Sequence, residues 1–209
     1  MIQNRESVYL GIDLNDRYAM ISYYQLHMDE PETVSTIAGG DVYQIPTLLA
    51  KRKGLGQWYY GDDAKKMAKT SEVVCVDALL RRAVNGETVR MEEESYEARE
   101  LLTLFLKRVM DLPRKLGTVR AYDCVVLSIE RLSKECMEMF WDIMPKLGLS
   151  QEQFMVVDHK ESFYYFTMSQ PANLWMHEVY LFEYEDSFSA TKTGYVFKGF
   201  YLKGDETKK

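Results

Sequence analysis

The feature that most constrains the fold lies at the start of the chain, where two apolar runs flank a short polar turn. Residues 8–12 and 19–25 are mostly apolar or aromatic, and residues 15–18 read Asn-Asp-Arg-Tyr. Such runs predict two strands joined by a tight turn. The turn contains no glycine, and Asn15 is the residue there that can adopt a left-handed conformation. We therefore expect an opening β-hairpin whose first strand delivers Asp13 to the turn.

Strand signals and helix signals then alternate along the chain. Apolar residues recur at three- and four-residue steps from Ala98 to Leu112, which predicts a long amphipathic helix. Its charged face, including Arg108, is interpreted as solvated surface. Ser133 is predicted to cap a second helix that stops near Gly148. The other predicted strands cover residues 32–37, 45–50, 124–129, 154–157, 178–184, 188–191 and 195–202, and the other predicted helices cover residues 63–69 and 161–170.

Three local details accompany these elements. An aspartate at the entrance of the helix over 63–69 is expected to cap it. The strand–helix–strand–helix order over residues 121–170 implies a parallel strand pair with a right-handed crossover. The last strands form a meander, and residues 204–209 are expected to fray.

Composition excludes several classes of protein. The 209 residues are 46% hydrophobic, which supports a packed domain, and a net charge of −6 argues against a nucleic-acid-binding surface. No apolar run approaches the roughly 20 residues that cross a bilayer, and the polar start lacks a secretory signal. Cys75, Cys124 and Cys136 lie in apolar runs without zinc-site spacing, so we expect buried, reduced thiols. A cytoplasmic protein that contacts neither membrane nor nucleic acid is predicted.

Seven segments, in order, resemble the first lobe of the actin-like and heat-shock-chaperone-type ATPase superfamily. The opening hairpin is similar to the phosphate-1 hairpin of that superfamily, which holds phosphates on the backbone amides of its turn. The remaining matches are IPTLLA (45–50), YGDDAK (60–65), VDALLR (76–81), the strand over 124–129 with the helix after it, VVDHK (156–160), and residues 179–188, which resemble the phosphate-2 hairpin.

The resemblance implies an α/β fold: an actin-like (ribonuclease-H-like) lobe with a mixed five-stranded sheet flanked by helices, plus the first hairpin of a second lobe. On this interpretation residues 1–174 form the first lobe, with a small inserted subdomain over about 40–118. Residues 175–209 would begin a second lobe, which is either truncated or completed in a longer polypeptide.

The residues at the superfamily's phosphate-binding positions differ from its pattern. Asn15, Asp16 and Arg17 replace a Gly-Thr-Thr turn, and the glycine-rich phosphate-2 turn becomes residues 183–188, with Glu183 and Asp186. A glycine-rich turn forms an amide-lined nest for an anion, whereas acidic side chains repel one.

Other positions bear on catalysis and metal binding. The superfamily's catalytic lysine falls on Leu79 and its catalytic glutamate on His159. Asp13 and Glu183 are candidate ligands for a hydrated magnesium ion, the alternative being that Asp13 closes the turn and Glu183 is solvated.

We therefore predict a catalytically degenerate domain that acts as a cytoplasmic binding or scaffold module, without a cofactor, and that binds a protein partner or a missing second lobe. The alternative is an ATPase that uses Mg-ATP and whose site is completed by an absent second lobe. A filament-forming actin relative is a third possibility. His159, with its polar neighbours, is either an acid/base cluster or a strand-to-helix turn. The aromatic run at 163–166 is either packing or an interaction surface, because it cannot all face one side of a helix.

Overall fold

The computed structural model describes residues 7–37, 39–115, 119, 121–171, 173, 179–184, 188–196 and 201–208, the last three segments as backbone. It divides into two compact units, Met1–Val157 and Asp158–Lys209, which are described separately below. The predicted lobe boundary at 174/175 lies further along the chain and stays a prediction.

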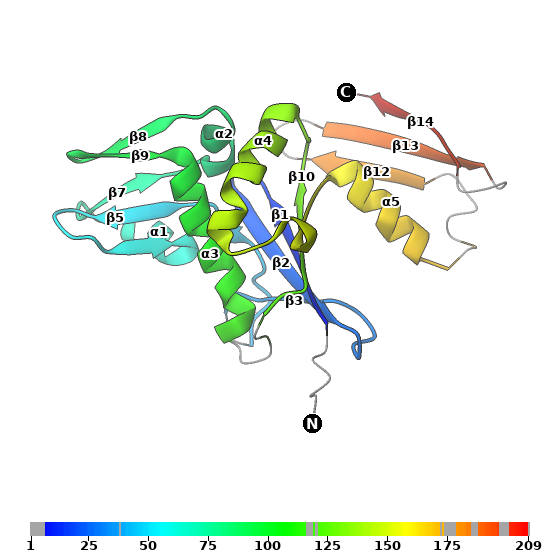
Figure 1. Ribbon diagram of the computed structural model, residues 1–209, viewed down its shortest axis with the longest axis horizontal. Coiled ribbons are helices and arrows are strands. Elements are labelled where there is room, and N and C mark those ends of the chain that lie inside the picture. Colours follow the sequence, from blue (N-terminus) through cyan, green and yellow to red (C-terminus); the bar gives the residue numbers. More distant parts are fainter. Residues whose placement is uncertain are drawn as a thin grey trace. The chain divides into compact units, whose positions relative to one another are not determined.

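The first unit is built on a mixed sheet (Figure 1). Its strand order is β11-β10-β1-β2-β3, and β4 also pairs with β2. β1 is antiparallel to β2 and parallel to β10, so the predicted opening hairpin and the mixed sheet are confirmed. The strands are β1 (Val8–Leu14), β2 (Tyr18–Gln25), β3 (Glu32–Thr33), β4 (Ile45–Pro46), β10 (Cys124–Ile129) and β11 (Phe154–Asp158).

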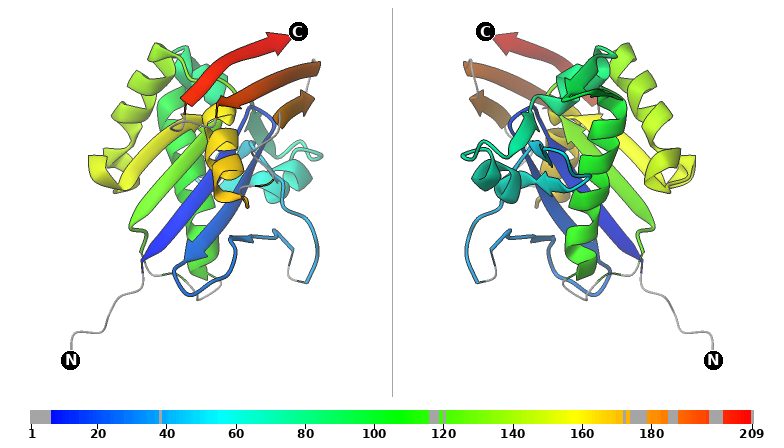
Figure 2. Two further views of the ribbon diagram at one scale, coloured as in Figure 1. Left: turned by 90° about the vertical axis from the view of Figure 1, so that its right-hand side faces the viewer. Right: turned by 90° about the vertical axis from the view of Figure 1, so that its left-hand side faces the viewer.

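Two helices cover one face of this sheet (Figure 2). α3 (Ala98–Lys115) buries the predicted apolar stripe, and Phe105 at its centre is fully buried. α4 (Lys134–Ile143) is capped as predicted, because the Ser133 hydroxyl accepts a hydrogen bond from the backbone N–H of Cys136 at 3.2 Å. A short 3-10 turn follows, and Gly148 ends it in a left-handed conformation. Local periodicity and capping thus predicted both helices.

The segment between β4 and α3 forms smaller elements that pack against the same core. A three-stranded antiparallel sheet has the order β6-β5-β7 and a hairpin joins β8 to β9. The elements are β5 (Leu49–Arg52), β6 (Trp58–Tyr60), α1 (Gly61–Met67), β7 (Val73–Val76), α2 (Leu79–Val84), β8 (Thr88–Met91) and β9 (Glu94–Glu97). Whether they constitute the predicted inserted subdomain stays a prediction.

Two predictions in this segment need correction. The strand predicted over 45–50 is split into β4 and β5, because residues 45–46 pair with β2 whereas residues 49–52 pair with β6 and β7. The helix predicted over 63–69 begins at Gly61, with Tyr60 as its N-cap and no side-chain cap. Asp62 and Asp63 lie within the first turn, where a carboxylate favours the helix dipole without capping it.

The second unit consists of one helix and an antiparallel meander. α5 (His159–Ser169) is capped by Asp158, whose carboxylate accepts from the backbone N–H of Glu161 at 2.8 Å. The strands are β12 (Val179–Tyr184), β13 (Phe188–Val196) and β14 (Tyr201–Lys208), in the order β12-β13-β14. The meander is confirmed, but the strand predicted over 195–202 is divided between β13 and β14, and the expected fraying of 204–208 is wrong. Antiparallel pairing with β13 holds these polar residues in a strand through their backbone.

The cysteines differ in exposure, so the expectation that all three are buried is wrong. Cys136 is buried, Cys124 is half-buried and Cys75 is exposed. Burial raises the pKa of the Cys136 thiol to about 11. Cys75 lies on β7, in a four-residue strand whose side chains alternate between the small sheet's two faces. In the described part of the chain, no helix is long and apolar enough to span a bilayer.

Candidate functional site

The turn between β1 and β2 is closed by the side chain of Asn15. The Asn15 carboxamide oxygen accepts hydrogen bonds from the backbone N–H groups of Arg17, at 2.8 Å, and Tyr18, at 2.9 Å. The Asn15 N–H donates to the carbonyl of Tyr18 at 3.0 Å. Asn15 is buried and does not have the left-handed conformation that the sequence allowed. Its side chain instead satisfies the turn, so the N–H groups of Asn15, Arg17 and Tyr18 already have acceptors within the protein.

Asp16, at the tip of this turn, reaches a helix distant in the sequence. Its carboxylate accepts from the backbone N–H of Arg81 at 2.9 Å and lies 3.7 Å from the Arg81 guanidinium. Arg81 is the third residue of α2, and the N-cap of that helix, Ala78, supplies no side-chain hydrogen bond. Ala78 also has a left-handed conformation, with φ +50°, which is costly for an alanine. Asp16 therefore caps α2 in place of the residue at the N-cap position.

Arg17, the third residue of the turn, is held by a backbone hydrogen bond to the residue that follows β4. The carbonyl of Arg17 accepts from the N–H of Thr47, while the Arg17 side chain is exposed. Thr47 is itself buried, and its hydroxyl oxygen lacks a hydrogen-bond partner among the described residues. Strand β4, helix α2 and the Asn15 side chain together hold the turn in one arrangement.

Asp13 and Leu79 complete this end of the first unit. Asp13 is half-buried near the end of β1, where it lies opposite Met20 of β2 and Ser128 of β10. Leu79, at the position of the superfamily's lysine, is fully buried in the main core. No group of three or more carboxylate, histidine or cysteine side chains with metal-binding geometry occurs among the residues described.

The remaining predicted site residues belong to the second unit. Glu183 lies on β12, paired with Ser189 of β13, and Asp186 falls outside the described residues. The magnesium site predicted from Asp13 and Glu183 spans the two units, so it stays a prediction. His159 is the first residue of α5, directly after the capping Asp158. The turn interpretation accounts for Asp158, whereas the acid/base role of His159 stays a prediction.

The aromatic run on α5 is distributed as its spacing requires. Tyr165 and Phe166 are 59% and 64% exposed, whereas Thr167 is buried. Tyr165 donates from its hydroxyl to the carboxylate of Glu161 at 3.2 Å, one helical turn earlier. The expectation that part of this run lies outside the helix's packed side is confirmed, and its role as an interaction surface stays a prediction.

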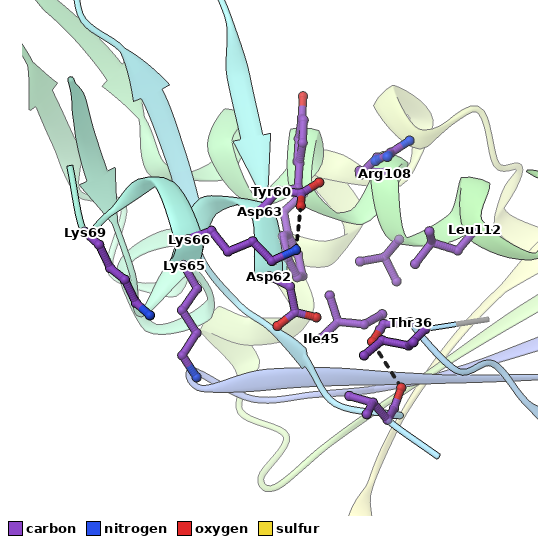
Figure 3. A pocket seen from close by; sticks show the side chains of 15 residues that line it. Thr36, Ile45, Tyr60, Asp62, Asp63, Lys65, Lys66, Lys69, Arg108 and Leu112 are labelled. Carbon is purple, nitrogen blue, oxygen red and sulfur yellow. Dashed lines mark hydrogen bonds and ion pairs between the residues drawn. The ribbon is translucent and has the colours of Figure 1, made fainter. Parts of the chain in front are cut away.

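A pocket that sequence reasoning missed lies beside Tyr60, between α1, α3 and the segment before β4 (Figure 3). Its volume is about 420 Å³. The floor of this Tyr60 pocket is apolar and includes Ile45, Phe105 and Val109, all buried. Gly61 permits this floor, because a Cβ at its position would lie 2.9 Å from the Ile45 side chain. The rim carries charged residues, namely Asp62, Asp63, Lys65, Lys66, Lys69 and Arg108.

The interpretation of Arg108 as solvated surface is wrong. Its guanidinium lies over the ring of Tyr60, 5.8 Å from the ring centre, and the side chain is half-buried. Burial raises the pKa of the Tyr60 phenol, and the charge of Arg108 partly opposes that rise. The sequence held a partial signal, Lys65-Lys66 and Lys69 on one predicted helix, but nothing local connects them to Arg108.

The fold and these sites define an α/β protein with a mixed central sheet flanked by helices. The model of the family described as "family of unknown function (DUF5716), C-terminal" matches residues 30–190, which is more than half of the chain. The protein therefore belongs to this family. None of the curated proteins compared with the sequence matches it.

Proposed function

We propose that this chain is a catalytically inactive, actin-like domain of the heat-shock-chaperone-type superfamily that serves as a binding or scaffold module. The order of its main sheet supports the actin-like assignment. The opening hairpin lies at the centre, β10 joins β1 in parallel, and a helix then leads to β11 at the edge.

The observation that carries the proposal is the closed state of the β1–β2 turn. In the superfamily that it resembles, the amides of this turn hold phosphate. Here the N–H groups of Arg17 and Tyr18 donate to Asn15. A phosphate would have to displace a buried internal acceptor, which costs about as much as the new hydrogen bonds return.

Charge acts in the same direction. The carboxylate of Asp16 binds the N-terminus of α2, a position that favours an anion. This helix begins at Leu79, where the superfamily has its catalytic lysine. Leu79 contributes no cation there and is buried. Phosphoryl transfer depends on positioning and on neutralising negative charge, and this turn offers neither. The proposal therefore includes no cofactor, a cytoplasmic location, and a protein partner or the second lobe of a longer chain.

Thermal unfolding with and without millimolar Mg-ATP tests this proposal, on this chain and on any longer natural form. A ligand at about 100 times its dissociation constant stabilises a fold by roughly 2.7 kcal/mol, a readily measured shift in Tm. We expect no shift that depends on Asp13. A Tm shift in wild-type protein that Asp13→Asn removes would establish nucleotide binding at the hairpin and favour the ATPase alternative. A shift that Asp13→Asn leaves intact would place the nucleotide elsewhere and would not support catalysis.

A further inference from the structure

We propose that the Tyr60 pocket binds a small organic anion, a carboxylate or a phosphate monoester carried on an apolar or aromatic body. This inference is independent of the proposed scaffold function, since the pocket lies within the first unit and uses none of the hairpin-turn residues.

The size of the pocket and its apolar lining call for an apolar body. Its volume of about 420 Å³ lies within the range of small-molecule sites. The three buried floor residues are at most 6% exposed and close the base of the pocket, so they offer a ligand almost no surface. The apolar surface that a ligand can cover comes from Ile37 and Val42, which are 54% and 39% exposed, and from the half-buried Leu112. A hydrated inorganic ion would leave this surface uncovered, whereas a ring or short hydrocarbon chain would cover it.

The charges at the rim select an anion. Four cations and two carboxylates line the pocket, a balance of +2 in a chain whose net charge is −6. Asp63 pairs with Lys66 at 3.4 Å, as Figure 3 shows. Among the described residues, no carboxylate forms an ion pair with Lys65, Lys69 or Arg108. Asp62 also forms no ion pair among these residues, so the charges open to a ligand are three cations and one carboxylate.

Arg108 is the group best placed to fix the ligand's orientation. Its guanidinium lies over the ring of Tyr60, which also lines the pocket, and this contact holds the charged group in place. A guanidinium presents paired N–H donors that match the two oxygens of a carboxylate or phosphate. Since the group is partly buried and already positioned, little side-chain entropy is lost when the anion binds.

The test is a ¹H–¹⁵N chemical-shift titration of the full chain with three probes of similar shape. They are 2-naphthoate, 2-naphthyl phosphate and the neutral 2-naphthamide. We expect saturable shifts at residues lining the pocket for both anions, and at least tenfold weaker binding of the amide. The relative affinities of the carboxylate and phosphate then identify which head group the site prefers. Absence of saturable binding at millimolar probe, or equal affinity for the amide, would overturn the proposal.

Matched variants separate a built site from general charge. Arg108→Gln should weaken both anions at least tenfold, whereas Lys107→Gln, on the same helix but outside the pocket lining, should change affinity less than twofold. Equal losses of affinity in the two variants would mean that only long-range charge attracts the anions, and this result would refute the site. If Arg108→Gln lowers the Tm, the exposed Lys69→Gln provides a second test, with at least a threefold loss expected.

Discussion

The hairpin turn at 15–18 and the Tyr60 pocket lie in the same unit. They differ in how many of their polar groups have a hydrogen-bond or ion-pair partner within the protein. In the turn, backbone donors bond to Asn15, and Asp16 occupies the start of α2. The pocket has an apolar floor, and its cations Lys65, Lys69 and Arg108 form no ion pair with a carboxylate of the described residues. On this proposal the anion binds at the Tyr60 pocket, whereas the superfamily resemblance indicates the hairpin turn. A turn that resembles a ligand site can be closed by its own side chains.

The largest expected effect is at the pocket floor, from Gly61→Ala. Gly61 has φ +55°, and an added Cβ would meet the Ile45 side chain at 2.9 Å. Left-handed strain of about 1–2 kcal/mol and overpacking of about 1–3 kcal/mol should together lower the free energy of unfolding by roughly 2–5 kcal/mol. Chemical denaturation measures this loss. The matched control is Gly148→Ala, with φ +77° but open space around it, which should show only the strain. Equal losses would mean that the floor is not closely packed.

The next effect tests the closed state of the turn. Asn15→Ala removes the acceptor of two backbone N–H groups and should cost about 1–3 kcal/mol of unfolding free energy. Asn15→Asp keeps an acceptor oxygen in the same place and should retain most of the stability. If Asn15→Ala proves as stable as wild type, the turn amides have other partners and the comparison with the pocket fails.

A smaller effect is expected at the tip of the turn. Asp16→Ala removes the side chain that caps α2 and should cost about 0.5–2 kcal/mol, measured by denaturation. Asp77 provides the control, because its carboxylate is near the same helix but is 75% exposed. Its ion pair with Arg82 is long, at 3.9 Å, and therefore weak. Asp77→Ala should change stability by no more than about 0.5 kcal/mol. If both variants lose a similar amount of unfolding free energy, the contribution of Asp16 is a general charge effect and not capping of α2.

The smallest effect concerns Lys51, a cation that has a carboxylate partner, unlike Lys65, Lys69 and Arg108 at the pocket. Lys51 and Tyr96 donate hydrogen bonds to Glu94, and the bond from Lys51 is the main reason that the pKa of Glu94 lies below its usual 4.5. Because the folded pKa is lower than the unfolded value, this stabilisation is present above about pH 4.5 and is lost as pH falls through the folded pKa. Glu94→Gln should therefore be less stable than wild type at pH 7, and the difference should vanish in acid. A difference that does not shrink as the pH is lowered into the acid range would contradict this linkage.

Local patterns predicted much of the fold correctly. Apolar runs placed the opening hairpin and β10, helical periodicity placed α3, and capping chemistry placed Ser133 at the start of α4. The errors arose where contacts between distant segments override local preference. Tyr60 is the N-cap of α1 although Asp62 is the better intrinsic cap, and polar residues 204–208 are a strand because β13 pairs with them.

Of the two sites, the sequence identified the turn and its residues but not their arrangement. It placed Asp13, Asn15, Asp16 and Arg17 at one turn and indicated that Asp16 opposes a bound anion. It could not indicate that Asp16 caps α2, whose Arg81 is 65 residues further on. The Tyr60 pocket was not predicted, because its cations come from α3 and from α1 with the residues just after it, and each segment resembles an ordinary solvated surface.

The sequence by itself determined the order of strands and helices, the polar glycine-free turn and the absence of a lysine at position 79, since these depend on neighbouring residues alone. The bonds from Arg17 and Tyr18 to Asn15 are local, and asparagine commonly closes turns in this way. Only the tertiary structure decided that Asp16 reaches α2 and that Arg108 lies over Tyr60. These two contacts join segments that are distant in the sequence through packing and burial, and no local pattern encodes which distant side chain will satisfy a given polar group.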